Sequence, residues 1–278
     1  HAHAAACRAE NRLEGPALAV TWDGTGLGTD GTIWGGEFFV GEGVDMRRIA
    51  TLLSFPLLGG DKVAREPRRS ALGLLWACYG EQAFDRHNLP PVRYLSTGDR
   101  TALRSAFRAG THTIATTSMG RLFDGVAALV GLRQTASFEG QAAMEFEFLA
   151  TGYATSRTYP FDLVPGSGGE PDRLDWRPMV AELERDIANG VDVRESAAAF
   201  HATVVEMIVA VARRSTMQRV TLSGGCFQNK ILVESAIRRL SDEGVAVFWH
   251  QRIPPNDGGI ALGQAVLGDQ RISNDQHA

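Results

Sequence analysis

The segment 22–31 combines residue types that bind anions and metal ions. It reads Trp-Asp-Gly-Thr-Gly-Leu-Gly-Thr-Asp-Gly and begins at the end of a short apolar run. Glycines allow backbone N–H groups to line up around a phosphate, threonine adds a hydroxyl donor, and aspartate offers a carboxylate to a cation. A glycine-rich hairpin turn with local hydrogen bonds from Asp and Thr is the alternative. The candidate site residues in this segment are Asp23, Gly24, Thr25 and Gly26.

A second glycine turn follows an apolar strand pattern at 219–222. Ser223, Gly224 and Gly225 lead directly into a helical pattern that contains Asn229. The N-terminus of such a helix offers free N–H groups and a partial positive charge to a phosphate. The spacing matches neither the Walker lysine loop nor the Rossmann glycine pattern. An ordinary strand-to-helix turn capped by the serine is the alternative.

Two further candidate segments lie near the two ends of the chain. Asn256 and Asp257 follow two prolines and precede a glycine-rich helix start, which suits either a helix cap or a metal-binding carboxylate. His1 and His3 are two residues apart and cannot share a helix face. A helical ligand pair would need a partner four residues before His3, so a frayed end or a tag remnant is the plain interpretation of these histidines.

Charge and cysteine content exclude several classes of protein. The 278 residues carry a formal net charge of −4, which provides no general basic field for nucleic acid. Cys7, Cys78 and Cys226 include no CxxC pair, which indicates neither a disulfide framework nor a cysteine zinc site. No apolar run reaches the ~18 residues of a spanning helix, and the start lacks signal-peptide features. We therefore expect a cytoplasmic protein without nucleic-acid or membrane partners, and the missing first methionine predicts a piece of a longer chain.

Strand and helix patterns place these candidates at the turns of an α/β fold. A three-strand meander is predicted at 17–22, 32–40 and 46–53. The middle is predicted to be mainly helical, with helices at 61–79, 101–109, 119–130, 141–150, 175–188 and 194–214, a strand at 153–163 and a loop at 165–171. Strands at 219–222 and 245–249 then alternate with helices at 225–240 and 259–267, which favours a parallel element.

The chain also carries many separate motifs in one order. They lie at 1–5, 23–26, 34–38, 59–62, 65–68, 120–124, 138–143, 223–225 and 255–259. The strand meander with a glycine-threonine loop, followed later by a strand, Gly-Gly and a helix, resembles the actin, hexokinase and heat-shock ATPase superfamily. Within it, the motifs resemble the C-terminal, Kae-like carbamoyl-transfer module of the hydrogenase-maturation carbamoyltransferase (HypF) family over essentially the whole chain. The resemblance implies a ribonuclease H-like α/β fold over 1–278, with an incomplete first lobe and a helical insertion at about 61–215.

The resemblance also implies which residues form the site. His3 matches the last histidine of the family's His-His-His-Ala-His motif, and Asp23 and Asp257 match its carboxylate positions. Such ligands suit Fe(II), Zn or Mn, and a divalent metal there polarises a carbonyl or phosphoryl oxygen as a Lewis acid. Asp23, Asp257 and Arg121 are the expected catalytic residues. The expected nucleotide-binding residues are Gly24, Thr25, Gly26, Gly59, Gly60, Asp61, Ser223, Gly224, Gly225 and Asn229, with 59–61 forming a wall near the ribose.

Four polar residues of the helical region are weaker candidates: Arg121, Asp124, Glu139 and Gln141. Each has the chemistry to orient a carbamoyl group or a partner's tail through charge-assisted hydrogen bonds. Buried pairing between helices explains them equally well.

In this family the module transfers a carbamoyl group from carbamoyl-adenylate to the C-terminal cysteine thiolate of HypE, for the cyanide ligands of NiFe hydrogenase. The resemblance thus implies ATP or carbamoyl-adenylate as ligand, the HypE tail as partner, and an upstream module, absent here, that makes the adenylate from carbamoyl phosphate and ATP. Because the partner supplies the thiolate, this chain needs no nucleophile of its own.

A departure from the family's histidine motif leaves alternatives open. The first two histidines of the five-residue motif are missing, so the metal site is expected to be incomplete. The alternatives are transfer of threonylcarbamoyl to tRNA, O-carbamoylation of a small molecule, and a non-catalytic nucleotide-binding docking fragment. The acidic balance and the motifs at 59–62 and 65–68 favour the hydrogenase-maturation role over both other transferases.

Overall fold

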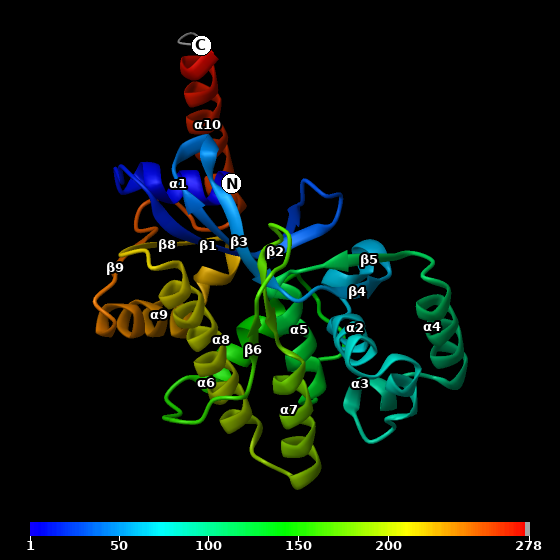
Figure 1. Cartoon of the computed structure of the whole chain (residues 1–278). Helices are drawn as coiled ribbons and strands as arrows, with labels where there is room; N and C mark the ends of the chain where they lie inside the picture. The colour runs from blue at the N-terminus through cyan, green and yellow to red at the C-terminus, as the bar shows by residue number, and fades with distance from the viewer. Residues whose placement is uncertain (276–278) are drawn as a thin grey trace.

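A mixed sheet forms the centre of the protein. The computed structural model describes residues 1–275, without the side chains of residues 61, 274 and 275. Within that range nine strands form the sheet; seven follow the order β6-β7-β3-β2-β1-β8-β9, and β5 joins β4 to β2 (Figure 1). The strands are β1 (Ala17–Leu27), β2 (Ile33–Gly41), β3 (Arg47–Leu52), β4 (Phe55–Leu58), β5 (Thr113–Thr116), β6 (Asp162–Val164), β7 (Asp172–Asp175), β8 (Arg219–Ser223) and β9 (Ala246–Trp249).

Helices cover both faces of this sheet. The α-helices are α1 (Ala2–Glu10), α2 (Pro67–Tyr79), α3 (Pro90–Arg93), α4 (Thr97–Ala109), α5 (Met119–Leu129), α6 (Gln141–Ala150), α7 (Arg177–Asn189), α8 (Val193–Ser215), α9 (Lys230–Asp242) and α10 (Ile260–Asp275). Five 3-10 turns complete the described elements: η1 (Gly43–Asp45), η2 (Gly60–Ala64), η3 (Gly80–Asp85), η4 (Gly225–Gln228) and η5 (Asp257–Gly259). Figure 1 shows α1 and α10 on one side of the sheet and α5 to α9 on the other.

Strand β1 is buried on both faces because its side chains alternate between two cores. Leu18, Val20 and Trp22 belong to the main core, which α5 and α8 complete. Ala19 points to the opposite face and belongs to a smaller core with residues of α1 and β2. This burial on both faces fixes the position of the strand whose far end carries Asp23.

The strand order confirms the predicted α/β fold of the actin, hexokinase and heat-shock ATPase superfamily. Strands β1, β2 and β3 form the predicted antiparallel meander. Strand β8 pairs in parallel with β1, and β9 pairs in parallel with β8, as the alternation of strands and helices near the C-terminus predicts. Segment 61–215 is mainly helical, as expected, but it also contributes β5, β6 and β7 to the sheet.

Three predicted helix starts are wrong, and the local chemistry explains them. The helix predicted from 101 begins at Thr97 as α4, because the Ser96 side chain accepts a hydrogen bond from the N–H of Asp99 and caps the helix there. The helix predicted from 61 begins at Pro67, because proline lacks an N–H and occupies the first helical position well. The helix predicted from 225 begins at Lys230 as α9, after the separate turn η4. Asn229 has an extended backbone there, and its side chain accepts a hydrogen bond from the N–H of Leu232, so it is the N-cap.

The predicted strand at 153–163 is also wrong. Only Asp162–Val164 pairs, as β6, and most of the segment has no regular structure. Its polar groups bond to helix side chains instead of a neighbouring strand. The N–H of Tyr159 donates to Thr203 Oγ1 at 2.7 Å, and the Tyr159 hydroxyl bonds to Asp186 at 2.7 Å. These tertiary contacts replace the strand pairing that the pattern predicts.

Helix α8 has the length and composition of a membrane span, but 78% of its most apolar window is buried inside the fold. Its burial matches that of a core helix.

Candidate active site

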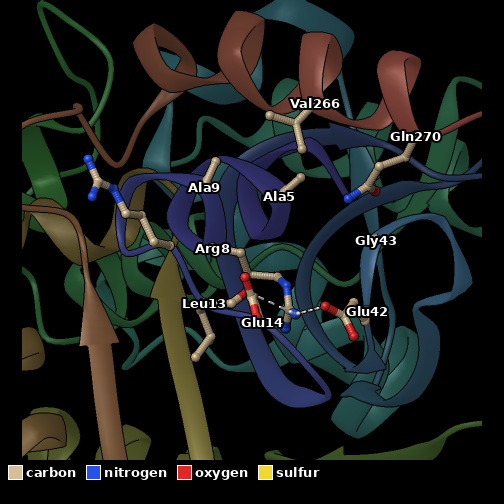
Figure 2. Close-up of a pocket in the computed structure, with 10 residues that line it drawn as sticks. Ala5, Arg8, Ala9, Leu13, Glu14, Glu42, Gly43, Val266 and Gln270 are labelled. Carbon is tan, nitrogen blue, oxygen red and sulfur yellow. Dashed lines mark hydrogen bonds and ion pairs between the residues drawn. The ribbon is translucent and has the colours of Figure 1, made fainter. Parts of the chain in front are cut away.

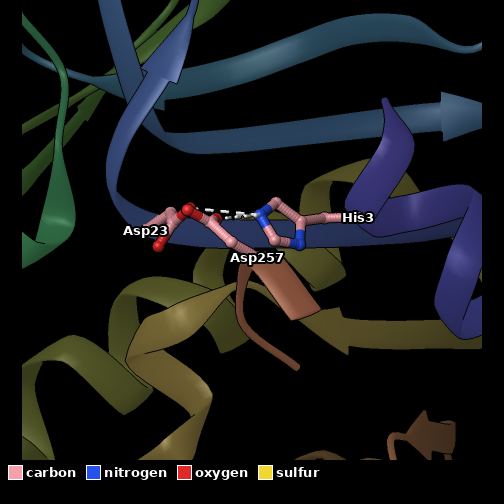
Figure 3. Close-up of side chains that lie close together, drawn as sticks. All are labelled: His3, Asp23 and Asp257. Atoms are coloured by element: carbon pink, nitrogen blue, oxygen red, sulfur yellow. Dashed lines mark hydrogen bonds and ion pairs between the residues drawn. The ribbon is translucent and has the colours of Figure 1, made fainter. Parts of the chain in front are cut away.

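Three side chains from distant parts of the chain meet in one cluster: His3 of α1, Asp23 of β1 and Asp257 of η5 (Figure 3). His3 Nε2 lies 3.1 Å from Asp23 Oδ2 and 3.8 Å from Asp257 Oδ1. All three ligand atoms lie within 4.8 Å of one another, so one cation has room to contact each of them. An imidazole with two carboxylates is a donor set that divalent transition metals accept.

The two carboxylates of the cluster have opposite pKa shifts. Burial alone would raise the pKa of Asp23, but the hydrogen bond and charge of His3 and the N–H groups of Gly24 and Gly225 outweigh it and lower this pKa. Burial and the charge of Asp23 raise the pKa of Asp257, against the effect of His3. Two acids so close repel each other, and a bound cation relieves that repulsion.

Asp23 also joins the two predicted glycine loops. Its Oδ1 accepts hydrogen bonds from Gly24 N at 2.9 Å and from Gly225 N at 3.2 Å. A Cβ at 225 would lie 2.7 Å from this same oxygen, and a Cβ at Gly120 would lie 2.8 Å from the Gly24 Cα. Glycine is therefore needed at 120 and 225, because the start of α5 and the turn η4 both approach the Asp23–Gly24 segment closely.

A cavity of about 780 Å³ extends from the cluster. It is large enough for a nucleotide-sized ligand. Its walls come from β1, α5, α6, η4 and η5. The lining residues include Asp23, Gly24, Thr25, Gly120, Arg121, Phe123, Asp124, Glu139, Gly140, Met144, Phe148, Gly225, Cys226, Asn229, Asn256 and Asp257. We call this space the central cavity.

Arg121 places a buried positive charge in the wall of the central cavity. Its guanidinium contacts Asp124 at 3.1 Å and Glu139 at 3.0 Å. The side chains of Arg121 and Asp124 are buried, whereas that of Glu139 is 64% exposed. Burial raises the pKa of Asp124 to about 6 despite the charge of Arg121, with Glu139 adding to the rise. The Nε of Arg121 has no hydrogen-bond partner within the described residues.

Several predicted site residues lie outside the walls of the central cavity. Gly26 pairs with Trp34 across the β1–β2 hairpin. Ser223 is fully buried and its hydroxyl lies 2.8 Å from His250 Nε2. Gly224, with φ +102, packs its backbone against that of Trp22. These three residues therefore support the glycine loops without lining the cavity.

Gly59 and Gly60 of the predicted ribose wall are likewise not part of the central cavity. Gly59 and Gly60 have positive φ and form the turn between β4 and α2, where Gly59 packs on Arg69. The side chain of Asp61 lies outside the described residues. Gln141 bonds to Ser137 N and Glu145, which stabilises the start of α6.

Sequence reasoning missed the histidine that holds Asn229. His201 of α8 is 2% exposed, and its Nε2 lies 2.9 Å from Asn229 Nδ2. The other ring nitrogen lies 2.8 Å from the carbonyl of Ala197. A lone histidine within an apolar helical run was the available signal, but such a residue is most often an ordinary core residue.

A second, smaller cavity of about 230 Å³ lies between α1 and α10 (Figure 2). Arg8 crosses it, and its guanidinium bonds to the carbonyls of Gly41, Leu13 and Gly15 and pairs with Glu42. These contacts tie α1 to the turns on either side of it, so Arg8 is part of the scaffold.

Comparison with known proteins gives a consistent result. A family model described as "Carbamoyltransferase, Kae1-like Domain, second subdomain" matches residues 19–264. Carbamoyltransferase HypF of Synechocystis sp. is 36% identical over 280 residues, which cover 96% of this chain and 36% of that protein. Carbamoyltransferase HypF of Rhizobium leguminosarum bv. viciae is 38% identical over 282 residues, with 100% and 35% covered. The chain thus spans about a third of the length of these relatives.

Among solved structures, the crystal structure of full-length HypF in the phosphate- and nucleotide-bound form is similar to this chain with a TM-score of 0.89 and 33% sequence identity. The similarity covers 98% of this chain and 35% of that one. The histidine-aspartate cluster and the central cavity therefore lie within the part of the fold that the two share.

Proposed function

Since this chain belongs to the HypF carbamoyltransferase family, we propose that it is a carbamoyl-transfer module acting on carbamoyl-adenylate. The carbamoyl group would pass to the C-terminal cysteine of HypE, for the cyanide ligands of NiFe hydrogenase. The thiolate sulfur bonds to the carbamoyl carbon, the bond from that carbon to the phosphate oxygen breaks, and AMP leaves with the electron pair. An upstream module supplies the adenylate.

The observation that carries this proposal is that two carboxylates of the histidine-aspartate cluster, Asp23 and Asp257, line the central cavity. The donor set of His3, Asp23 and Asp257 fits a divalent cation such as Fe, Zn or Mn. When bound, such a cation supplies Lewis-acid polarisation of a carbonyl or phosphoryl oxygen. Asp23 and Asp257 are then the carboxylates that hold it beside the reacting group.

Arg121 and the glycine loops would bind the nucleotide. The buried Nε–H of Arg121 lacks a protein acceptor within the described residues, and a ligand oxygen at this wall would supply one. Gly24, Thr25, Gly225 and Asn229 line the same cavity, and a related full-length HypF was crystallised with nucleotide. Gly26, Ser223 and Gly224 support these loops indirectly.

The chain's own cysteines fit a reaction whose nucleophile comes from the partner. Burial raises the pKa of Cys7 and of Cys78 to about 12. Cys226 lines the central cavity, and burial together with the charge of Asp23 raises its pKa well above the usual value. All three remain protonated near neutral pH and are therefore poor nucleophiles. We expect the module to act in the cytoplasm on a protein tail, without nucleic acid.

The test is transfer of carbon-labelled carbamoyl-adenylate to a peptide with the HypE C-terminal sequence, in the presence of Zn²⁺ or Fe²⁺. We expect labelled peptide with a terminal cysteine and none when that cysteine is replaced by serine. Asp257→Ala should abolish transfer, whereas Glu206→Gln, which alters an ion pair with Arg239 on α9, should leave it unchanged. Partner binding without transfer would contradict the proposal and favour a docking fragment.

A further inference from the structure

The loop that carries Asp257 is fastened to the same helix that carries His3. Glu10, at the end of α1, is 3% exposed at its side chain. Its Oε1 accepts hydrogen bonds from the backbone N–H groups of Gln251 at 2.9 Å, Arg252 at 2.6 Å and Ile253 at 3.4 Å. One buried carboxylate thus organises three successive residues of the loop between β9 and η5.

His250 extends this contact to the end of β8. Its Nδ1 lies 2.7 Å from Glu10 Oε2, and its Nε2 lies 2.8 Å from Ser223 Oγ. Burial opposes ionisation of Glu10, but the N–H groups of Gln251 and Arg252 and the His250 ring outweigh it and lower the pKa of this acid. Because a carboxylate only accepts, Nδ1 carries the ring proton and donates to Glu10.

The spacing along α1 explains how one helix both carries His3 and contacts the loop that leads to Asp257. His3, Cys7 and Glu10 are four and three residues apart, so they share one helix face. His3 reaches Asp23, and the Cys7 thiol lies near the carbonyls of Leu222 and Phe248, which pins this face to β8 and β9. The loop closes back on β8 through a hydrogen bond from Gly224 N to the Pro255 carbonyl at 2.9 Å.

Asp257 itself has little direct support. Its side chain is 78% exposed, and its ion-pair contact with His3 is long at 3.8 Å. The position of its carboxylate therefore depends on the backbone of the loop at 250–256, which Glu10 organises.

We propose that Glu10, acting through His250 and the backbone at 251–253, is a positioning residue that sets Asp257 against His3 and Asp23 and so controls divalent-cation affinity. The inference rests on the metal site of the proposed function. Glu10→Gln replaces an acceptor-only group by an amide whose NH₂ must face either the loop N–H groups or the His250 N–H. At least one donor then loses its partner and the loop shifts. Loss of such an outer-shell partner typically costs 10–100-fold in metal affinity.

The experiment is calorimetric titration of Zn²⁺ into the whole chain, comparing the unsubstituted protein, Glu10→Gln, Asp257→Asn and the double variant, with Glu206→Gln as a matched control. We expect Glu10→Gln to weaken the Kd about 10–100-fold. The double variant should bind no more weakly than Asp257→Asn alone, because Glu10 acts through Asp257. If Glu10 only stabilises the fold in general, the losses of Zn²⁺ affinity caused by the two substitutions should multiply in the double variant.

The outcomes separate the two hypotheses. If the unsubstituted chain binds no cation, the metal site itself is refuted and the role of Glu10 with it. If it binds but Glu10→Gln leaves the Kd unchanged, or the two losses multiply, only the positioning role is refuted. If thermal unfolding shows that Glu10→Gln does not fold, His250→Phe, which removes both ring hydrogen bonds, takes its place. It must weaken Zn²⁺ binding in the unsubstituted background but cause no further loss when it is combined with Asp257→Asn. His250→Gln, which retains a donor for Glu10, must show a smaller loss.

Discussion

Protonation of His201 should account for a measurable part of the destabilisation of this protein by acid. The ring is buried, and burial lowers its pKa from 6.5 to about 4 against a hydrogen bond to the Ala197 carbonyl. Its Nε2 accepts from Asn229, whose own Oδ1 caps α9 at Leu232. Protonation would set an N–H against the Asn229 amide and disturb that cap. The neutral ring is therefore required in the folded state.

The magnitude follows from the two pKa values. The unfolded chain binds a proton near pH 6.5 and the folded chain only near pH 4, so this stability is present above 6.5 and is lost as pH falls toward 4. At 1.36 kcal/mol for each pKa unit, the whole loss is about 3 kcal/mol, of which about 2 kcal/mol has occurred by pH 5. Such a loss is measurable in a protein of ordinary stability.

The assay is urea unfolding at pH 7 and pH 5 for the unsubstituted chain and for His201→Gln, which does not titrate. The unsubstituted protein should lose about 2 kcal/mol more of its unfolding free energy between these pH values than the variant does. The exposed His87 provides a matched control, since His87→Gln should retain the full loss. Equal losses in the unsubstituted chain and His201→Gln would refute the reasoning.

Three further predictions concern Gly224, which supports the glycine loops from outside the cavity, and two residues of the cavity wall, Asp124 and Arg121. Gly224→Ala should lower the unfolding free energy by about 2–4 kcal/mol, because φ is +102 and the new Cβ would lie 2.2 Å from the Trp22 carbonyl; an unchanged urea midpoint would contradict this. Asp124→Asn should gain stability relative to the unsubstituted chain as pH rises from 4 to 7. The pKa of Asp124 is about 6 in the folded chain and 3.8 in the unfolded chain, so ionisation of Asp124 destabilises the unsubstituted fold over this range; urea unfolding that gives the opposite slope would exclude it. Arg121→Met should weaken ATP binding about 10-fold or more in calorimetry, because a charged hydrogen bond is worth about 1.5–3 kcal/mol, and equal affinities would remove Arg121 from the site.

The parts of the fold with strong periodic patterns could be predicted from sequence. Alternation in β1 and the long apolar faces of α5 and α8 are local signals that burial then reinforces. Short elements such as β5 and β7, of four residues each, have no such signal, because their pairing depends on neighbours far along the chain. The pattern near Tyr159 predicts a strand, but the partners of this extended segment are side chains of α7 and α8, which the local sequence does not indicate.

The candidate site likewise has parts that the sequence predicts and parts that it does not. The sequence predicts the glycine loops from their residue types, and it predicts the approach of His3, Asp23 and Asp257 from the motifs that resemble those of the HypF family. It does not predict the direction in which Ser223 points, because the partner of Ser223, His250, lies 27 residues away and is oriented by Glu10, 240 residues from it. Contacts at such separation leave no periodic trace in the sequence.

The most direct test of the account is anomalous diffraction from crystals of this chain grown with Mn²⁺ and a non-reactive analogue of carbamoyl-adenylate. The account predicts a manganese peak among His3, Asp23 and Asp257, with the analogue in the central cavity, its phosphate between the loops of Gly24 and Gly225. A peak elsewhere, or the analogue bound outside that cavity, would contradict the claim that the cluster and the cavity form one carbamoyl-transfer site.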